Sequence, residues 1–359
     1  MWWDTLLDPF RGKAVTIPPM DGAFRPNTRL ETAEAFVEVA RPEALLVHEG
    51  RLLVASGTDL LAFPLEGGAP TPLHRFETAI SALAGLPDGG LAVGLVAGEV
   101  RLVGGRFDGR VVTEVAGRRI HAPTALATTG EGILYIAVGS ARYGADDWQS
   151  DLMAQGASGA VLRLDLIESD GRILADGLAW PAGLLVEPDR SLIVSEASRH
   201  RLVRITGDGR SKPQPVLSNL PGYPSRLARA AGGGAWLALM APRNRLVELV
   251  LTERAYREDM VATIPRELWI APQMSSGNSF LEPLQCGGVV TMGVRKPWAP
   301  GRSYGLIARL DDHLRPVASL HSRADGHRHG IRDMAEIGGV LFAASRGGNA
   351  VLEIETGAA

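Results

Sequence analysis

The chain has 359 residues and a formal net charge of −3, and its charged residues form no block of one sign. This distribution argues against a surface that follows nucleic-acid phosphates. Hydrophobic residues make up 45% of the chain, and the 43 glycines and 23 prolines indicate a globular protein with many turns. The sequence contains no run of about 18 apolar residues, the length needed to span a bilayer.

The first residues, MWWDTLLDPFRGK, carry Asp4 and Asp8 where a signal peptide has a basic segment followed by an unbroken apolar one. We therefore expect a cytoplasmic protein that does not bind membranes. Cys286 is the only cysteine. A single cysteine excludes an intrachain disulfide and a zinc site built from cysteines.

A repeated pattern of strands extends from about residue 42 to the end of the chain. Each repeat has an apolar strand, a turn with Gly, Asp or Glu, a second apolar strand and a further strand. Repeats of about forty residues with turn-bounded strands are typical of a β-propeller. The first strands open at Glu43, Ser81, Thr124, Ala182, Ser225 and Arg332. Six such positions predict an all-β fold, a six-bladed propeller.

Two repeats contain insertions. The third has the polar loop RYGADDWQSDLMAQGASG, and the fifth has an insertion at about residues 244–302 with apolar residues at helical spacing. We expect the insertion to form a lid over the tunnel mouth, with a helical segment from about Arg254 to Trp269 that borders the same pocket as Ser225. Deleting the predicted lid segment from Gln273 to Gly287 should then alter ligand binding more than global stability. A seventh blade within this insertion is the alternative interpretation.

The segment AEAFVEVA, ahead of Glu43, alternates apolar and polar residues like a strand. We expect it to form the outer strand of the last blade, because this closes the ring and removes exposed sheet edges. The predicted organisation is an N-terminal extension at residues 1–34 and a propeller at residues 35–359.

Several segments resemble the strictosidine synthase-like branch of the six-bladed propellers, which is related to gluconolactonases and paraoxonases. They are WPAGLLVEPDRSLIVSEASRHRLVRI, LPGYPSRLARAAGGGAWLAL, YGLIARLDDHLRPVASL and HGIRDMAEIGGVLFAAS. The resemblance covers about residues 42–355. It implies the fold and a small-molecule site at the central tunnel.

The lactonase relatives hold a calcium ion in the tunnel through a Glu of the first blade and Asn or Asp residues of later blades. The resemblance implies that the same positions of this chain would be the ligands of such an ion. Glu43 matches that Glu, but Thr124, Ala182 and Ser225 stand at the other positions. One carboxylate does not balance a divalent cation, so we expect no metal and no other cofactor. The alternative is a calcium lactonase with shifted ligands, because a one-residue change in alignment would bring in Asp176 or Asp333.

Strictosidine synthases condense an amine with an aldehyde, and their catalytic Glu precedes the first strand of the last blade. The matching stretch here, GHRHGIRDM, places His329 and Arg332 near that position. An arginine stays protonated and does not shuttle protons. We therefore expect that the chain is not a true strictosidine synthase.

The predicted catalytic residues are Glu43, His121 and His329. A carboxylate in a partly dry tunnel has a raised pKa, and an imidazole titrates near neutral pH. For Glu43 the structural alternative is an ion pair with Arg226 or Arg332. For the histidines it is a hydrogen bond to the backbone.

The predicted substrate-binding residues would line the same mouth. Arginines suit a substrate carboxylate and aromatic residues suit an apolar wall. The set is Ser225, Arg226, Arg332, Tyr223, Trp180 and Thr124.

The leading prediction of function is a metal-independent enzyme acting on a small molecule, such as a lactone or ester hydrolase. The alternative from another class is a non-catalytic module that binds a small metabolite or a protein partner.

Two further polar residues have structural interpretations. Glu196 and Arg201 are spaced to pair across adjacent strands, as the family resemblance also implies. Asp165 follows a strand and is expected to cap a turn.

Overall fold

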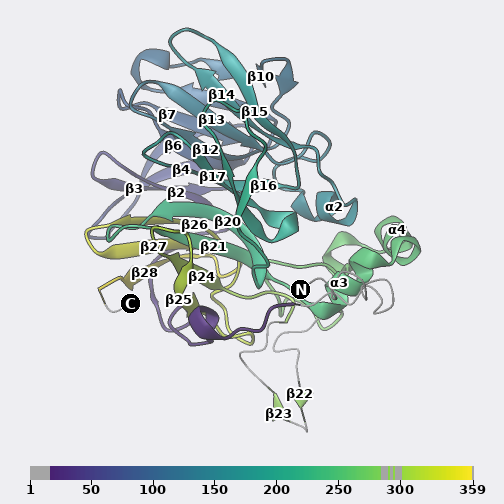
Figure 1. Cartoon of the computed structure of the whole chain (residues 1–359). Coiled ribbons are helices and arrows are strands. Elements are labelled where there is room, and N and C mark those ends of the chain that lie inside the picture. Colours follow the sequence, from purple (N-terminus) through teal and green to yellow (C-terminus); the bar gives the residue numbers. More distant parts are fainter. Residues whose placement is uncertain (1–16, 284–289, 292–293, 296–300, 358–359) are drawn as a thin grey trace.

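The computed structural model describes residues 17–283, 290–291, 294–295 and 301–357. Within this part of the chain, six antiparallel sheets of four strands each form the blades of a propeller (Figure 1). The innermost strands of neighbouring blades contact one another in a closed ring. The prediction of six blades is confirmed.

Each of the first three blades follows the chain from its innermost to its outermost strand. The first blade contains β2 (Pro42–His48), β3 (Arg51–Ser56), β4 (Asp59–Pro64) and β5 (Thr71–Arg75). The second contains β6 (Ile80–Gly85), β7 (Leu91–Leu95), β8 (Glu99–Val103) and β9 (Val111–Val112). The third contains β12 (Pro123–Thr128), β13 (Ile133–Val138), β14 (Gly159–Asp165) and β15 (Gly171–Leu178).

The last three blades include the fifth-blade insertion and the closure of the ring. The fourth contains β16 (Pro181–Val186), β17 (Leu192–Glu196), β18 (Arg201–Ile205) and β19 (Gln214–Leu217). The fifth contains β20 (Gly222–Arg229), β21 (Ala235–Pro242), β24 (Leu306–Leu310) and β25 (Pro316–His321). The sixth contains β26 (Ile331–Ile337), β27 (Val340–Ser345), β28 (Ala350–Glu355) and β1 (Glu34–Glu38).

The ring is closed by β1, which supplies the outer strand of the sixth blade. It pairs antiparallel with β28, with Glu34 opposite Glu353 and Glu38 opposite Ala350. This confirms the predicted pairing of the segment before the first blade with the last blade. Ahead of β1, Met20 and Phe24 pack against the apolar cluster of the fifth blade.

The hydrophobic core lies between neighbouring blades, and β13 is an example of a strand that packs on both sides. All six residues of β13 are buried. Leu134, Ile136 and Val138 pack in a cluster shared with the second blade, whereas Ile133 and Tyr135 pack in one shared with the fourth. Successive side chains of a strand point to opposite faces, so a strand buried on both sides is apolar throughout.

The remaining elements are short helices and two small hairpins. The helices are η1 (Gly22–Phe24), η2 (Gly105–Phe107), α2 (Trp148–Met153), η3 (Ala197–Arg199), α3 (Arg245–Thr252), α4 (Arg254–Thr263) and η4 (Arg266–Leu268). The hairpins pair β10 (Glu114–Val115) with β11 (Arg118–Arg119) and β22 (Val290–Thr291) with β23 (Val294–Arg295). No helix in the described ranges is long and apolar enough to cross a bilayer.

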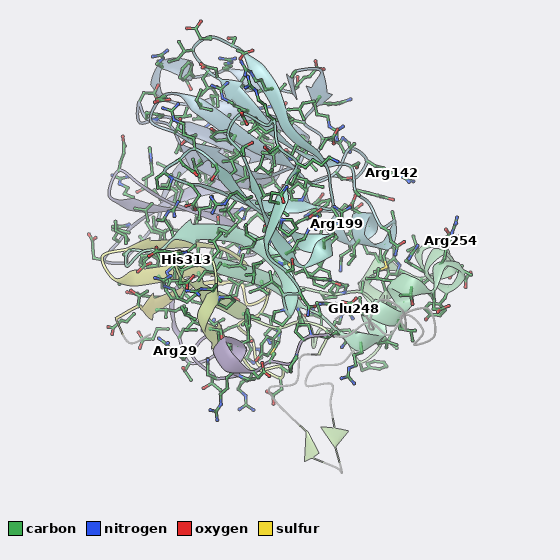
Figure 2. The ribbon with its side chains drawn as sticks, in the orientation of Figure 1. Arg29, Arg142, Arg199, Glu248, Arg254 and His313 are labelled. Carbon is green, nitrogen blue, oxygen red and sulfur yellow. The ribbon has the colours of Figure 1, made fainter. Side chains whose placement is uncertain are left out.

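The helices α3 and α4 follow β21 of the fifth blade and lie beside α2 (Figure 1). Asn244 caps α3, accepting a hydrogen bond of 2.8 Å from the Leu246 N–H. Glu248 of α3 is buried and accepts a hydrogen bond of 2.7 Å from Arg243. Arg254 of α4 projects away from the propeller (Figure 2). Met260 of α4 is buried together with Val250 of α3, so both helices are anchored to the propeller.

Candidate functional site

The residues that open the inner strands lie at irregularities in strand pairing. In the first blade the register shifts between Pro42 and Ala44, which leaves Glu43 outside the regular ladder. The same shift occurs around Ser81, Thr124 and Ala182 in the next three blades. A bulge changes the direction of a side chain and ends regular pairing. The bulges thus place one residue per blade at the central tunnel.

The fifth and sixth blades have wider irregularities. In these blades the register shifts between Pro224 and Leu227 and between Ile331 and Met334. Each gap holds two residues, so Arg226 joins Ser225 and Asp333 joins Arg332. The two additional residues are both charged and buried.

Arg226 lies in the centre of this arrangement. Its guanidinium group donates hydrogen bonds to the backbone carbonyls of Glu43, Ser81 and Thr124, the last at 3.0 Å. These carbonyls belong to three consecutive blades. Arg226 Nη2 lies 3.6 Å from Glu43 Oε1, and Nη1 lies 3.7 Å from Asp333 Oδ2. One cation therefore joins the openings of three blades to two carboxylates.

The Glu43 carboxylate is held by three guanidinium groups. Arg332 donates to Oε1 from Nε at 2.9 Å and from Nη2 at 2.6 Å, and Arg346 donates to Oε2. Burial alone raises the pKa of Glu43, but Arg332, Arg346 and Arg226 together lower it to about 2. The ion pair predicted as the structural alternative for Glu43 is present. A carboxylate with so low a pKa is a weak base at neutral pH.

Asp333 is the second carboxylate beside the Arg226 guanidinium group. Its Oδ2 accepts from the Leu45 N–H at 2.9 Å, and its Oδ1 accepts from its neighbour's N–H, that of Met334, at 2.8 Å. Burial raises the pKa of Asp333, and this effect exceeds the opposing one of Arg226. The two tunnel carboxylates therefore have pKa values shifted in opposite directions.

Two predicted substrate-binding hydroxyls join neighbouring blades. Thr124 Oγ1 donates to the Pro181 carbonyl at 2.5 Å, and Ser225 Oγ donates to the Arg332 carbonyl at 2.9 Å. Arg332 Nη1 also contacts Ser225 Oγ at 3.2 Å. Both hydroxyls are thus engaged within the ring.

These residues do not fit a calcium ion in the tunnel. Calcium takes six to eight oxygen ligands, usually with several carboxylates. Here the converging carbonyls already face the Arg226 guanidinium, and Arg332 and Arg346 take up both oxygens of Glu43. Among the described residues, no three His, Cys, Asp or Glu side chains form a cluster suited to a metal.

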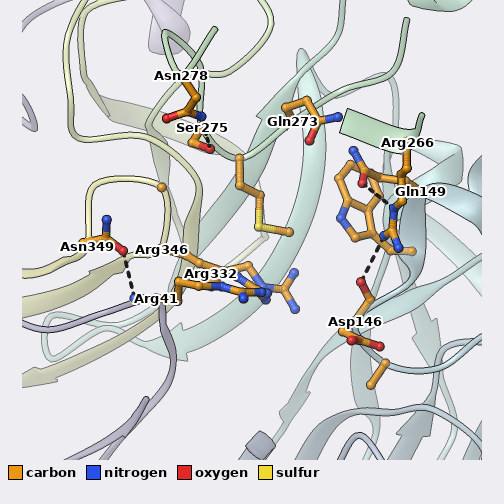
Figure 3. A pocket seen from close by; sticks show the side chains of 14 residues that line it. Arg41, Asp146, Gln149, Arg266, Gln273, Ser275, Asn278, Arg332, Arg346 and Asn349 are labelled. Carbon is orange, nitrogen blue, oxygen red and sulfur yellow. Dashed lines mark hydrogen bonds between the residues drawn. The ribbon is translucent and has the colours of Figure 1, made fainter. Parts of the chain in front are cut away.

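A cleft lies at the tunnel mouth. It consists of a cavity of ≈ 410 Å³ and a second of ≈ 490 Å³, which share Arg41, Ala145, Asp146 and Arg346 in their walls. Glu43 and Ser81 line the larger cavity, and Arg332 lines the smaller one. Figure 3 shows Arg41, Arg332 and Arg346 on one wall of the smaller cavity and Gln149 and Arg266 on the opposite wall.

Sequence reasoning missed Arg41 and Arg346. Arg41 directly precedes β2, and its backbone N–H donates to Asn349 Oδ1 at 3.0 Å. Arg346 follows β27 in the turn SRGGN of the last blade. In an antiparallel blade, the turn after the second strand lies at the same end as the start of the first strand. This rule could have placed Arg346 near Glu43 from the sequence.

The two predicted catalytic histidines do not contact Glu43. His121 Nε2 bonds to the carbonyl of Arg142 at 3.0 Å. His329 Nδ1 lies 2.7 Å from Ser303 Oγ, and its Nε2 lies 2.7 Å from the Arg323 carbonyl oxygen. Burial lowers the pKa of His329. Neither histidine lines the two cavities that form the cleft.

Tyr223 and Trp180 lie beneath the helices and outside the cleft walls. Both are fully buried in an apolar cluster that includes Trp148 of α2, Val250 of α3 and Met260 of α4. The rings of Tyr223 and Trp148 meet edge to face at 5.6 Å. The two predicted residues thus support the insertion.

The segment after η4 borders the smaller cavity. Gln273, Met274, Ser275 and Asn278 line it together with Arg332. Ser225 is not among its lining residues, although it bonds to Arg332. Residues 284–287 of the predicted lid lie outside the described residues.

Comparisons with known proteins support the predicted resemblance. A family model described as strictosidine synthase matches residues 125–207. An adipocyte plasma membrane-associated protein of Danio rerio is 28% identical over 249 residues, which cover 63% of this chain. The match spans 60% of that relative's length. A strictosidine synthase-like protein 10 of Arabidopsis thaliana is 27% identical over 145 residues, 40% of this chain and 37% of its own.

Two solved structures share the fold. A gluconolactonase-like protein superposes with a TM-score of 0.56 at 12% identity, covering 90% of this chain and 91% of its own. The calcium-binding protein regucalcin of Agrobacterium tumefaciens has a TM-score of 0.54 at 13% identity, covering 90% and 93%. At such identities the superpositions show the fold alone. Together these matches confirm that the chain resembles the strictosidine synthase-like six-bladed propellers and has gluconolactonase-like structural neighbours.

Proposed function

We propose that the cleft at the tunnel mouth binds a small organic molecule and that this binding needs no divalent metal ion. The observation that carries the proposal is the position of Arg226, whose guanidinium group bonds to the carbonyls of three blades beside Glu43 and Asp333. A fixed cation at this point neutralises carboxylates that would otherwise attract a metal.

The rest of the cleft suits a small ligand. Clefts of roughly 300–1,000 Å³ with a few converging polar groups are typical small-molecule sites. Here the smaller cavity alone measures ≈ 410 Å³ and has arginine, glutamine and asparagine side chains in its walls. Regucalcin is called a calcium-binding protein, and the Arg226 arrangement is our reason not to extend that property to this chain.

A thermal-shift screen of small metabolites, run in parallel with EDTA and with calcium chloride, tests the proposal. A ligand that binds the folded state raises the melting temperature. We expect the same compounds to raise it by the same amount in both series. Stabilisation by metabolites only in the calcium series would contradict metal independence.

Hydrolysis of a lactone or ester is a second candidate function, supported by the contact between Ser303 and His329. The Arg323 carbonyl only accepts hydrogen bonds, so Nε2 of His329 carries the proton and Nδ1 is an acceptor within reach of the Ser303 hydroxyl. The same hydroxyl also lies 2.7 Å from Ser276 Oγ, to which it donates when it does not donate to Nδ1.

Because burial lowers the pKa of His329, the imidazole is neutral at pH 7. The Ser303–His329 pair would transfer the hydroxyl proton to Nδ1 as the serine oxygen bonds to the acyl carbon of an ester or lactone. The acyl C–O bond then breaks, the leaving oxygen takes the proton from Nδ1, and water hydrolyses the acyl-serine to free acid and serine.

The hydrolase candidate is tested by turnover of a panel of lactones and p-nitrophenyl esters. We expect hydrolysis that is lost in Ser303→Ala and retained in Ser319→Ala, which removes another buried serine. Equal activity in both variants would contradict a role for Ser303. A catalytic role for Glu43 has less support, because its carboxylate is already paired with three arginines.

The relatives of Danio rerio and other vertebrates are called plasma membrane-associated. For this chain, a cytoplasmic location without membrane binding stays our prediction. Fractionation of cells that express the full chain tests it, and recovery in the membrane pellet would contradict it.

A further inference from the structure

We infer that the ligand of the cleft is a small organic monocarboxylate, whose carboxylate is held between Arg346 and Arg41. This inference rests on the proposed function and adds the chemical class of the ligand. It depends on the charges of the tunnel floor, on the free donors of two arginines and on the other polar residues of the smaller cavity.

The charged residues at the base of the cleft, here called the tunnel floor, carry more positive than negative charge. They are three arginines, Arg226, Arg332 and Arg346, which face two carboxylates, Glu43 and Asp333. At most two of the three positive charges are therefore balanced, and fewer are when Asp333 is protonated. Arg266 at the opposite wall is separately paired with Asp147 at 2.8 Å. Because unbalanced charge away from water is costly, an anion is favoured at this floor.

Arg346 is the floor cation that is best placed for a ligand. Its Nη1 donates to Glu43 Oε2, and within the described chain its Nε and Nη2 have no side-chain partner. Its side chain is 18% exposed, compared with 4% for Arg332 and 7% for Arg226. It lines both cavities of the cleft. Arg346 therefore presents free donors at the point where the two cavities meet.

Arg41 is the second cation at that point, and it also lines both cavities. Its backbone has a φ of 49°, and its N–H bonds to Asn349 Oδ1. The side chain has no ion-pair partner in the part of the chain that the structure describes. Figure 3 shows Arg41 and Arg346 on the same wall. Planar guanidinium groups match the geometry of a carboxylate with paired hydrogen bonds.

The other polar residues of the smaller cavity indicate a polar body for this ligand. Gln149, Gln273 and Asn278 line this cavity, and Gln273 Nε2 is buried without a hydrogen-bond partner. An unpaired buried donor costs about 1–3 kcal/mol, and a ligand oxygen would satisfy it. Trp148 and Met274 add limited apolar surface. A compact carboxylate with an amide, carbonyl or hydroxyl group fits this cavity better than a long alkyl chain.

The charge excess also distinguishes carboxylate from phosphate. Asp146 lines both cavities and partly offsets Arg41 at the rim. The charges of the cleft therefore have an excess of about one positive charge, which a ligand with one negative charge would neutralise. Inorganic phosphate is largely a dianion at pH 7.5, so we expect it to bind more weakly than a monocarboxylate.

The test compares monocarboxylates with their own neutral amides. The probes are N-acetylglycine, lactate, pyruvate and benzoate, each paired with its primary amide, plus inorganic phosphate, titrated into the full chain in EDTA by calorimetry. We expect at least one acid to bind ten-fold or more tightly than its amide and than phosphate. The inference is overturned if no acid binds more tightly than its amide, or if phosphate binds more tightly than every acid.

Matched variants locate the binding. Arg41→Gln should weaken the binding of the best acid at least ten-fold without changing the melting temperature, because Arg41 is exposed. Arg51→Gln makes the same charge change at the β2–β3 turn, away from the cleft, and should leave binding unchanged. Equal affinity in both variants would overturn the assignment to Arg41.

The two proposals fail in different ways. If neutral compounds bind in EDTA and acids do not, the metal-independent cleft stands and the carboxylate inference falls. If acids bind only after calcium is added, the proposed metal independence falls.

Discussion

Two buried glutamates, Glu196 and Glu43, are each paired with arginines, but the two clusters differ in how far their arginines are exposed to water. Glu196, at the end of β17, is fully buried and accepts from Arg199 and Arg201, both at 2.5 Å, and from the Ala179 N–H at 2.8 Å. Those arginines are 42% and 27% exposed. Around Glu43 in the tunnel, Arg226 and Arg332 are almost entirely buried, and Arg346 is 18% exposed.

The difference lies in where the arginine charge resides. Around Glu196 the guanidinium groups reach water, which screens their charge. In the tunnel, water does not surround Arg226 or Arg332, so their charge must be balanced by the protein or by a ligand. The comparison teaches that an arginine–carboxylate cluster is a candidate site when its arginines, as well as its acid, are buried.

The largest expected effect comes from removing the tunnel cation. Arg226→Met leaves three backbone carbonyls and Asp333 without their shared partner, and breaking such a buried pair costs about 3–5 kcal/mol. We expect a loss of this size in the free energy of unfolding, measured by urea denaturation. Arg229→Met is the control, because Arg229 lies in the same strand but is 44% exposed. Equal losses in the two variants would contradict the comparison.

A smaller loss is expected from Glu43→Gln, about 3 kcal/mol at pH 7, since the amide keeps the shape but not the charge. The pKa of Glu43 is lowered from 4.5 to about 2 by folding. Its contribution is therefore complete above pH 4.5 and is lost as the pH falls toward 2.

Urea denaturation of the wild type and of Glu43→Gln between pH 7 and pH 3 measures this dependence. The difference in unfolding free energy between the two proteins should shrink below pH 4.5. A difference that stays constant over this range would show that Glu43 is not the carboxylate that the arginines stabilise.

The smallest effect is expected at the other glutamate. Glu196→Gln weakens two charge-assisted hydrogen bonds, but its arginines remain in contact with water, so we expect a loss of about 1–2 kcal/mol. Ligand binding in the cleft should be unchanged. A change in ligand affinity as large as that of Arg41→Gln would remove the distinction between the two clusters.

Much of the architecture followed from the sequence because each repeat carries its own turn and strand signals. The six strand-opening residues all lie at irregularities in strand pairing, which span one residue in the first four blades and two in the last two. The pairing of Glu196 with Arg201 and the turn at Asp165 were also predictable, because the contacts are local. Asp165 Oδ1 accepts from the Ile167 and Glu168 N–H groups.

The detailed tunnel contacts were less accessible to sequence reasoning. Sequence analysis placed Arg226 beside Ser225 at the tunnel mouth and offered its ion pair with Glu43 as an alternative, but not its hydrogen bonds to the carbonyls of three blades. Regular strand alternation places neighbouring residues on opposite faces and would point Arg226 away from Ser225. The two-residue irregularity in β20 changes this direction, and an alternation pattern does not show where a bulge occurs. Arg346 meets Glu43 across 303 residues, and such a contact exists only once the ring has closed.

The most direct test of the central role of Arg226 is calcium titration by calorimetry. The wild type, treated with EDTA and dialysed, is titrated with calcium chloride alongside Glu43→Gln. Because the guanidinium group already neutralises the tunnel carboxylates, we predict no stoichiometric binding with a micromolar dissociation constant in either protein. A one-to-one micromolar isotherm in the wild type that disappears in Glu43→Gln would contradict Arg226 as the tunnel cation.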